Sequence, residues 1–240
     1  SIGDFNGQKI IFVGDKDGIF YAINENGTLR FQHETNANIS ISPVLAMKGS
    51  MSQGEFFAAF GNDEGKVYMA ALDGSLTSFL DADGAITGLS SFAVEGETVE
   101  WGQNLAVTTD EGYMYFYQDN DIWDYFPIQY ENSFKGHIVI EDTDNDGDLE
   151  VLAGTTSTLF IADHKIKHSN FYYGNSWNTY KGDNRRSGFR SFDVDLSSCN
   201  LGDVNSDGIT DILDVVQTIA IIMGNVSPSP DQSCASDLNS

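Results

Sequence analysis

Positive charge is scarce in this chain. Its 240 residues include 12 Lys and Arg against 36 Asp and Glu, which gives a formal net charge of −24. Such a surface repels the phosphates of nucleic acids and of anionic membranes, so neither is expected as a partner. Divalent cations are attracted wherever the carboxylates cluster. The simpler interpretation, that the acids only keep the protein soluble, stays open beside this one.

Long hydrophobic runs and the common catalytic motifs are also missing. Apolar stretches such as Thr218 to Met223 are too short to span a bilayer. No charged start and apolar stretch of a signal peptide follows Ser1, which fits a mature or truncated product. The two cysteines, Cys199 and Cys234, form no CxxC pair, and there is no GxSxG, HExxH, GxGxxG or P-loop pattern. The sequence therefore favours a protein that is not an enzyme.

One unit is repeated along the first part of the chain. An apolar run is followed by a polar turn rich in Asp and Gly, and then by a run of aromatic and β-branched residues. The turns start at Gly14, Gly61, Thr108 and Gly154, with spacings of 47, 47 and 46 residues. Two short strands around a tight turn are a hairpin signal. A period in the forties is that of a β-propeller blade.

This periodicity predicts an all-β, propeller-like repeat domain over residues 1–190, with about four blades and an incomplete set. The alternative is a group of unrelated hairpins in a β-sandwich, against which the near-constant spacing argues. Residues 191–198 are expected to be a linker. Residues 199–240 are expected to form a small α-helical module that resembles an EF-hand.

The first candidate metal site is the acidic stretch from Asp142 to Glu150. Oxygen donors fall at positions 1, 3, 5, 7 and 9, and a glycine, Gly147, stands at position 6. The donors are Asp142, Asp144, Asp146, Asp148 and Glu150. Alternating carboxylates on a sharply turning backbone can converge on one calcium ion, which takes six to eight oxygens. Without a cation they would repel one another. An ordinary acidic turn is the alternative.

This loop runs directly into the strand Val151 to Gly154, and in that arrangement the region resembles FG-GAP/VCBS propeller repeats. The resemblance implies a calcium-binding loop before the strand. The stretch from Trp177 to Gly188 resembles a segment that closes bacterial propellers of this kind. For it we expect a packing role, with Trp177 and Tyr180 buried, rather than a ligand site.

The second candidate metal site begins at Asp203 and has the spacing of an EF-hand loop. Donors fall at positions 1, 3, 5, 9 and 12, position 6 is glycine, and position 7 would give its backbone carbonyl. These ligands are Asp203, Asn205, Asp207, Ile209, Asp211 and Asp214. A helix from Ile212 to Met223 is expected to follow, ended by Gly224.

Aspartate at position 12, with the helix that follows, makes this module resemble a type I dockerin repeat. A second repeat begins near Cys234, with Asp237 and Asn239 in the places of Asp203 and Asn205, and is truncated. The resemblance implies calcium-dependent docking onto a cohesin-like protein domain. The contact positions it implies are Ile212, Leu213, Ile219 and Ala220. A disulfide between Cys199 and Cys234 is a hypothesis, with two free thiols as the alternative.

The sequence thus predicts a non-catalytic, calcium-binding, modular protein that is extracellular or at a cell surface. Its C-terminal module would mediate protein–protein assembly, and its propeller would serve as a binding scaffold. Two alternatives remain. One is a fragment of a secreted polysaccharide-degrading enzyme, because the distance between carboxylates cannot be read from sequence. The other is a carbohydrate-binding or adhesion propeller.

Overall fold

The computed structural model describes most of the chain. The described residues are 1–5, 7–48, 55–92, 104–118, 121–144, 146–167, 177, 179–182, 185–191, 202, 204–205 and 212–223. The chain divides into two compact units, unit 1 (Ser1–Asp193) and unit 2 (Val194–Ser240), and each is considered by itself.

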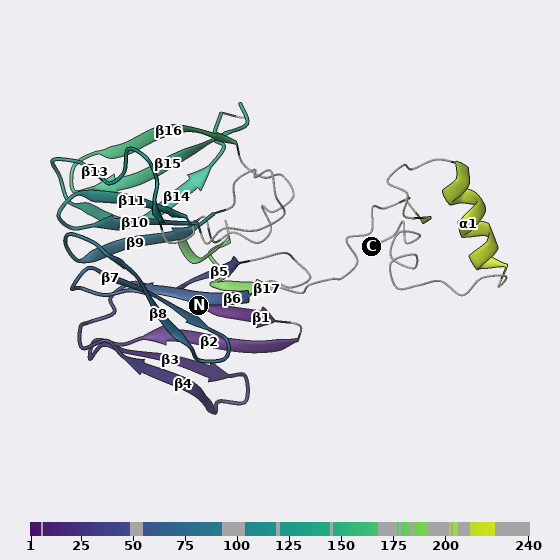
Figure 1. The fold of residues 1–240 in the computed structure, drawn as a ribbon, viewed down its shortest axis with the longest axis horizontal. Helices are drawn as coiled ribbons and strands as arrows, with labels where there is room; N and C mark the ends of the chain where they lie inside the picture. Colours follow the sequence, from purple (N-terminus) through teal and green to yellow (C-terminus); the bar gives the residue numbers. More distant parts are fainter. Residues whose placement is uncertain are drawn as a thin grey trace. The chain divides into compact units, whose positions relative to one another are not determined.

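Unit 1 is built of β-strands that follow one another along the chain (Figure 1). The strands are β1 (Ile2–Phe5), β2 (Gln8–Gly14), β3 (Ile19–Asn24), β4 (Leu29–Glu34), β5 (Val44–Lys48), β6 (Glu55–Gly61), β7 (Lys66–Ala71), β8 (Leu76–Asp81), β9 (Ile86–Ser91), β10 (Leu105–Thr109), β11 (Tyr113–Gln118), β12 (Asp121–Ile122), β13 (Ile128–Gln129), β14 (Phe134–Glu141), β15 (Asp148–Thr155), β16 (Leu159–Lys167) and β17 (Phe189–Ser191). A short 3₁₀ turn, η2 (Tyr180–Gly182), precedes β17.

Within the described residues these strands form four sheets, and each sheet corresponds to one repeat. The first sheet has the order β17-β1-β2-β3-β4, the second β5-β6-β7-β8, the third β12-β11-β10-β9 with β13 also on β11, and the fourth β14-β15-β16. Neighbouring strands are antiparallel, except that β17 runs parallel to β1. The predicted all-β, propeller-like arrangement is therefore confirmed at this level. The sheets are stacked face against face along the unit (Figure 1).

One side chain per repeat fixes the turn between the second and third strands of each sheet. Asp15 accepts hydrogen bonds from the N–H groups of Asp17 and Ile19. The side chains of Asn62, Thr109 and Thr155, at the same place in the later repeats, also accept backbone N–H groups of their turns. A short polar side chain that bonds its own backbone is the usual means of holding such a turn.

A glycine in the same turn is required for two reasons. Gly18, Gly65 and Gly112 all have φ between +82° and +84°. A Cβ at Gly65 would also lie 2.3 Å from the carbonyl oxygen of Ala82. The turn glycines of the repeat therefore permit both a left-handed backbone and the close approach of the next loop.

Apolar side chains between successive sheets make the core. Aromatic rings dominate the contact between the first two sheets, where Phe20 stacks on Phe60 with ring centroids 4.0 Å apart. One cluster of buried residues extends over the first three sheets, and a second cluster joins the third and fourth sheets.

The described residues of the last segment of unit 1 contact the first strands of the sheets. Trp177 is buried, and its backbone N–H donates to Ser91 Oγ at 2.9 Å. Ser91 Oγ in turn donates to the carbonyl of Leu45 at 2.7 Å. The ring of Tyr180 lies 4.5 Å from that of His137, and β17 pairs with β1. The expected burial of Trp177 is confirmed. That of Tyr180 is wrong, because its ring lies against His137 at the surface and is 39% exposed.

Unit 2 contains the helix α1 (Ile212–Ile222), which agrees with the expected helix to within one residue. Met223 continues it as a turn, with its N–H donating to the carbonyl of Ile219 at 2.9 Å. Within the described residues, no helix of either unit is long and apolar enough to cross a membrane.

Candidate metal centre

The acidic loop predicted as the first metal site joins two neighbouring strands of the fourth sheet. Asp142 directly follows β14, and Glu150 lies within β15. Gly147 has φ +95°, and a Cβ built there would meet nothing within 4 Å, so the turn is open to solvent on that side. The hairpin therefore delivers the acidic side chains to one end of the sheet.

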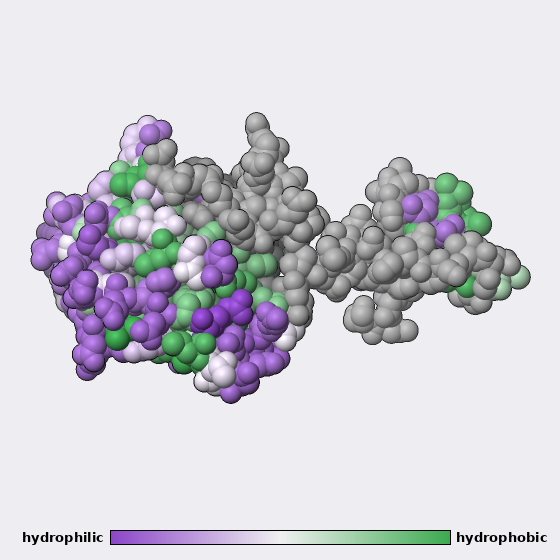
Figure 2. Space-filling view, turned by 60° about the horizontal axis from the view of Figure 1, so that its bottom comes forward, coloured by the Kyte–Doolittle hydropathy of each residue, from purple (hydrophilic) through white to green (hydrophobic). Residues whose placement is uncertain are grey.

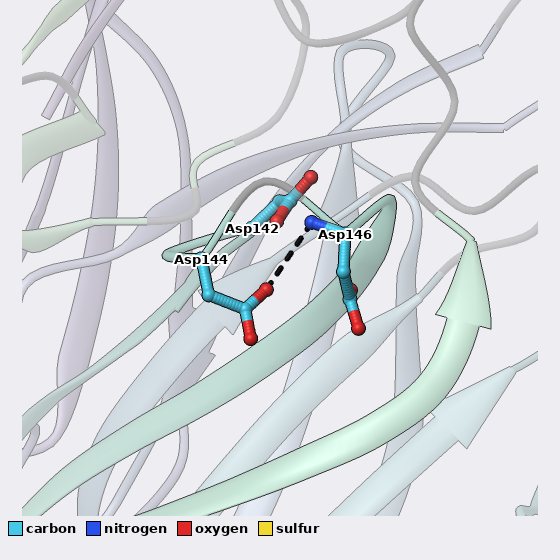
Figure 3. A group of neighbouring side chains, drawn as sticks. All are labelled: Asp142, Asp144 and Asp146. Carbon is cyan, nitrogen blue, oxygen red and sulfur yellow. Dashed lines mark hydrogen bonds between the residues drawn. The ribbon is translucent and has the colours of Figure 1, made fainter.

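Three of the predicted ligands come together in this loop. Carboxylate oxygens of Asp142, Asp144 and Asp146 all lie within 4.8 Å of one another (Figure 3). The backbone holds them in place. Gly147 N–H donates to Asp142 Oδ2 at 3.1 Å, Asp146 N–H to Asp144 Oδ1 at 3.2 Å, and Asp148 N–H to Asp146 Oδ1 at 3.0 Å. Each of these bonds fixes one carboxylate oxygen of an aspartate against the backbone of the loop.

Glu150 adds a buried carboxylate beside the loop. Its side chain is 5% exposed, and its Oε2 accepts hydrogen bonds from the N–H and the hydroxyl of Thr143, at 2.6 and 2.8 Å. Its Oε1 is buried and meets no hydrogen-bond donor among the described residues. A buried carboxylate oxygen without a donor costs free energy, unless a cation supplies the missing interaction. An all-oxygen donor set of this kind fits calcium.

The charges of the neighbouring acids contribute to a raised pKa of Asp144. The largest single effect on the pKa of Asp144 is the hydrogen bond from Asp146 N–H, which by itself would lower this pKa. Desolvation and the charges of Asp146, Glu150 and Asp142 outweigh it, so the pKa of Asp144 is raised above its usual value. A bound divalent cation would reverse this balance, because it favours the ionised form.

The strands on either side extend the acidic region. Glu150 lies directly opposite Glu141 on β14 and Asp163 on β16, so the three carboxylates share one face of the fourth sheet. Sequence spacing did not reveal this row, or the role of Thr143, because both depend on strand register. The one available signal was a Thr between two Asp at the start of the loop.

The second predicted site is described only in part. Asn205 N–H donates to Asp214 Oδ1 at 3.0 Å, and the Asp214 side chain is buried. The carboxylate at position 12 of the predicted loop therefore lies beside the backbone of position 3. Asp203, Asp207, Ile209 and Asp211 lie outside the described residues, and so do Cys199 and Cys234.

Helix α1 presents apolar side chains to solvent. Of the four predicted partner-contact residues, Ile212, Leu213 and Ile219 are exposed and Ala220 is half-buried. Val215, Val216 and Met223 are exposed as well, while Val204 in the preceding loop is buried. The structure thus places the predicted contact residues on one short helix that follows directly from the Asp214 region.

Comparison with known proteins shows no family for this chain. No family model matches it, and no curated protein matches it. Among solved structures, two crystal structures of BBS1N in complex with ARL6DN, soaked with mercury and with lead, are similar to it with TM-scores of 0.48 and 0.47. Both are 21% identical to it. Each match covers 67% of this chain and 43% of the BBS1N chain, so this chain spans less than half the length of the chains that it matches.

Proposed function

We propose that this protein is a non-catalytic, calcium-binding, modular protein that acts outside the cell or at its surface. In this proposal unit 1 is a binding scaffold whose fourth sheet is tied together by calcium. The module of residues 199–240 is a dockerin-like module that assembles with a cohesin-like protein domain in a calcium-dependent manner.

The observation that carries the proposal is the loop between β14 and β15. It brings three aspartate carboxylates within 4.8 Å and sets beside them the buried Glu150, whose Oε1 has no donor among the described residues. Asp142, Asp144, Asp146 and Glu150 would hold the ion, with Asp148 as a further ligand. The ion would supply positive charge that offsets the repulsion among them.

Partner docking by unit 2 rests on a separate line of support. The predicted loop of Asp203 to Asp214 has EF-hand spacing, and Asp214 closes back onto Asn205 at 3.0 Å. Calcium would fix this loop and with it the start of α1, whose exposed apolar residues would meet the partner. Loss of calcium would then weaken docking even without a contact between the partner and the metal.

A calorimetric calcium titration of the EGTA-treated chain tests both parts. We expect two classes of site in the wild type. Asp142→Ala with Asp144→Ala should remove one class, and Asp203→Ala with Asp207→Ala the other. Asp81→Ala with Asp83→Ala, two acids at the end of β8 and in the turn after it, is the matched control and should leave the titration unchanged. No calcium uptake by the wild type would refute the proposal. Uptake that both site variants retain would do the same.

One observation favours carbohydrate binding by unit 1 as a second candidate. Tyr125, in the turn between β12 and β13, is 96% exposed and has φ +72°, which is uncommon for a tyrosine. The ring of Phe126, the next residue, stacks on that of Phe116 with centroids 4.6 Å apart, which ties the turn to β11. A flat aromatic ring held out in this way can lie against the apolar face of a sugar. Glycan binding that Tyr125→Ala abolishes would favour this function.

A further inference from the structure

Few acidic side chains in the described part of the chain are buried. Hydrophilic residues cover much of the face of unit 1 that Figure 2 shows. Among the described residues, three acids are buried: Asp4, Glu150 and Asp214. Asp4 is paired with Lys9, whose Nζ lies 3.2 Å from Asp4 Oδ2. Glu150 has no such cationic partner among the described residues, so its burial calls for another interaction that offsets the charge.

One residue of the acidic loop occupies one oxygen of the Glu150 carboxylate. The backbone N–H of Thr143 donates to Glu150 Oε2 at 2.6 Å, and the Thr143 hydroxyl donates to the same oxygen at 2.8 Å. Glu150 Oε1 is buried as well and meets no donor among the described residues. The two oxygens of this carboxylate therefore differ, because the protein satisfies Oε2 twice and leaves Oε1 without a hydrogen bond.

The position of Thr143 in the loop links Glu150 to the aspartate cluster. Thr143 stands between Asp142 and Asp144, two of the three aspartates whose carboxylate oxygens lie within 4.8 Å of one another (Figure 3). Its two hydrogen bonds tie the Glu150 carboxylate, which belongs to strand β15, to the part of the loop that carries this cluster. The charge of Glu150 also acts on Asp144 and helps to raise its pKa, so the two carboxylates lie within electrostatic range of each other.

We propose that Thr143 is a positioning residue of the calcium site and that Glu150 binds the ion through Oε1 alone. This inference rests on the proposed function, because it takes the loop between β14 and β15 as a calcium site. Calcium accepts carboxylates through one oxygen or through two. The two hydrogen bonds on Oε2 favour the one-oxygen mode, since binding through both oxygens would compete with them. Thr143 thus orients a ligand of the metal without touching the metal itself.

Two other roles of Thr143 are compatible with the same hydrogen bonds. In the first, Thr143 only holds the loop and has no effect on calcium. In the second, the Thr143 hydroxyl is itself a ligand of the ion and acts independently of Glu150. The positioning role is favoured because the hydroxyl already donates to Glu150, and because a neutral hydroxyl attracts calcium less than the carboxylates that the same loop offers.

Calorimetric calcium titration of the full chain measures the class of site that Asp142→Ala with Asp144→Ala removes. Thr143→Val keeps the shape of the side chain without the hydroxyl, and should weaken calcium binding at this site by about 10-fold or more. Thr143→Ser keeps the hydroxyl and should retain the wild-type affinity. Thr143 is exposed, so both variants should fold, which circular dichroism would verify. Thr155→Val is the matched control, because the Thr155 hydroxyl lies at the other end of β15, donates to Thr158 O at 3.0 Å, and should not affect calcium binding.

Infrared spectroscopy with and without calcium gives a second measurement, which a merely structural role would not change. The antisymmetric stretch of a carboxylate has different positions for one-oxygen and two-oxygen coordination of a metal. Glu150 is the one glutamate among the predicted ligands of both loops, so isotope labelling of glutamate side chains isolates its calcium-dependent band. In the wild type this band should have the one-oxygen position. In Thr143→Val, where Oε2 has lost one of its two donors, the band should move toward the two-oxygen position.

The outcomes separate this inference from the proposed function. No calcium uptake at this loop by the wild type would remove both. Uptake by the wild type that Thr143→Val leaves unchanged, or that Thr155→Val weakens equally, would overturn this inference alone. So would a wild-type Glu150 band at the two-oxygen position, or a Thr143→Ser protein that binds as weakly as Thr143→Val. Weaker binding by Thr143→Val with an unchanged Glu150 band would make the hydroxyl a ligand itself, and would also overturn the positioning role.

Discussion

The turn glycines of the repeat offer a test in which two substitutions differ in one physical variable. Gly65 has φ +84° and Gly27 has φ +83°, and both lie in turns between strands. A Cβ at Gly65 would come within 2.3 Å of Ala82 O, whereas a Cβ at Gly27 would meet nothing within 4 Å. Alanine at either position therefore has the same backbone cost, and only Gly65→Ala adds a steric collision with main chain.

The expected magnitudes follow from these two contributions. A left-handed alanine costs about 1–2 kcal/mol, and a Gly→Ala change recovers about 0.4–1 kcal/mol from the unfolded chain. Gly27→Ala should therefore lower the free energy of unfolding by about 0–1.6 kcal/mol. At Gly65 the carbonyl of Ala82 belongs to a backbone that also bonds Gly65, since Ala82 N–H donates to Gly65 O at 2.8 Å. Displacing the Ala82 carbonyl to make room for the new Cβ should raise the loss in free energy of unfolding for Gly65→Ala to about 3 kcal/mol or more.

Urea denaturation followed by tryptophan fluorescence measures this difference. All three tryptophans, Trp101, Trp123 and Trp177, lie in unit 1, so the signal reports that unit and not unit 2. Equal losses at the two positions would refute the steric reasoning. A larger loss at Gly27 than at Gly65 would refute the structural assignment of both turns.

Three further predictions concern the segment at Trp177 and the acidic loop. Trp177→Ala should lower the free energy of unfolding of unit 1 by about 3–5 kcal/mol, measured by urea denaturation followed by circular dichroism, because it empties a buried site. Glu150→Gln should leave the calcium-free protein at least as stable as the wild type in thermal melts, because the substitution removes a buried charge. The same substitution should reduce the stabilisation by calcium. A Glu150→Gln protein that calcium stabilises as much as the wild type would contradict this prediction. Because the pKa of Asp144 is raised in the fold, protonated Asp144 contributes to the stability of the calcium-free protein. This contribution is fully present below the ordinary pKa of 3.8 and is lost as the pH rises through the raised pKa. Stability of the calcium-free protein at that site should therefore fall with rising pH in this window, and calcium affinity should rise, which melts and titrations from about pH 3 to about pH 7 would show.

The repeat could be predicted from sequence because local chemistry dictates it. Asp15 and Gly18 recur as Asn62 and Gly65, and the structure shows why, since the polar side chain holds the turn and the glycine permits its backbone. The convergence of Asp142, Asp144 and Asp146 followed from their spacing in the same way. Features of this kind lie within about ten residues of chain, where the backbone leaves few options.

Contacts between distant segments could not be predicted in this way. The parallel pairing of β17 with β1 joins residues almost 190 apart and leaves no periodic signal. The exposure of Tyr180 was mispredicted because its neighbour is His137, a half-buried residue of the fourth sheet whose pKa is lowered by desolvation. Nor could spacing show that Glu150 is buried, since its environment comes from the strands on both sides.

The return of the segment from Trp177 to β17 has a consequence for how the chain is made. Each sheet pairs strands that are close in sequence, so it can form soon after its own repeat leaves the ribosome. The bond from Trp177 to Ser91 must wait until residue 177 has emerged, and the pairing of β17 with β1 until residue 191 has emerged. Until then the nascent chain holds four sheets whose first strands have not yet received this segment. The last step in the folding of unit 1 during synthesis is therefore the pairing of β17 with β1.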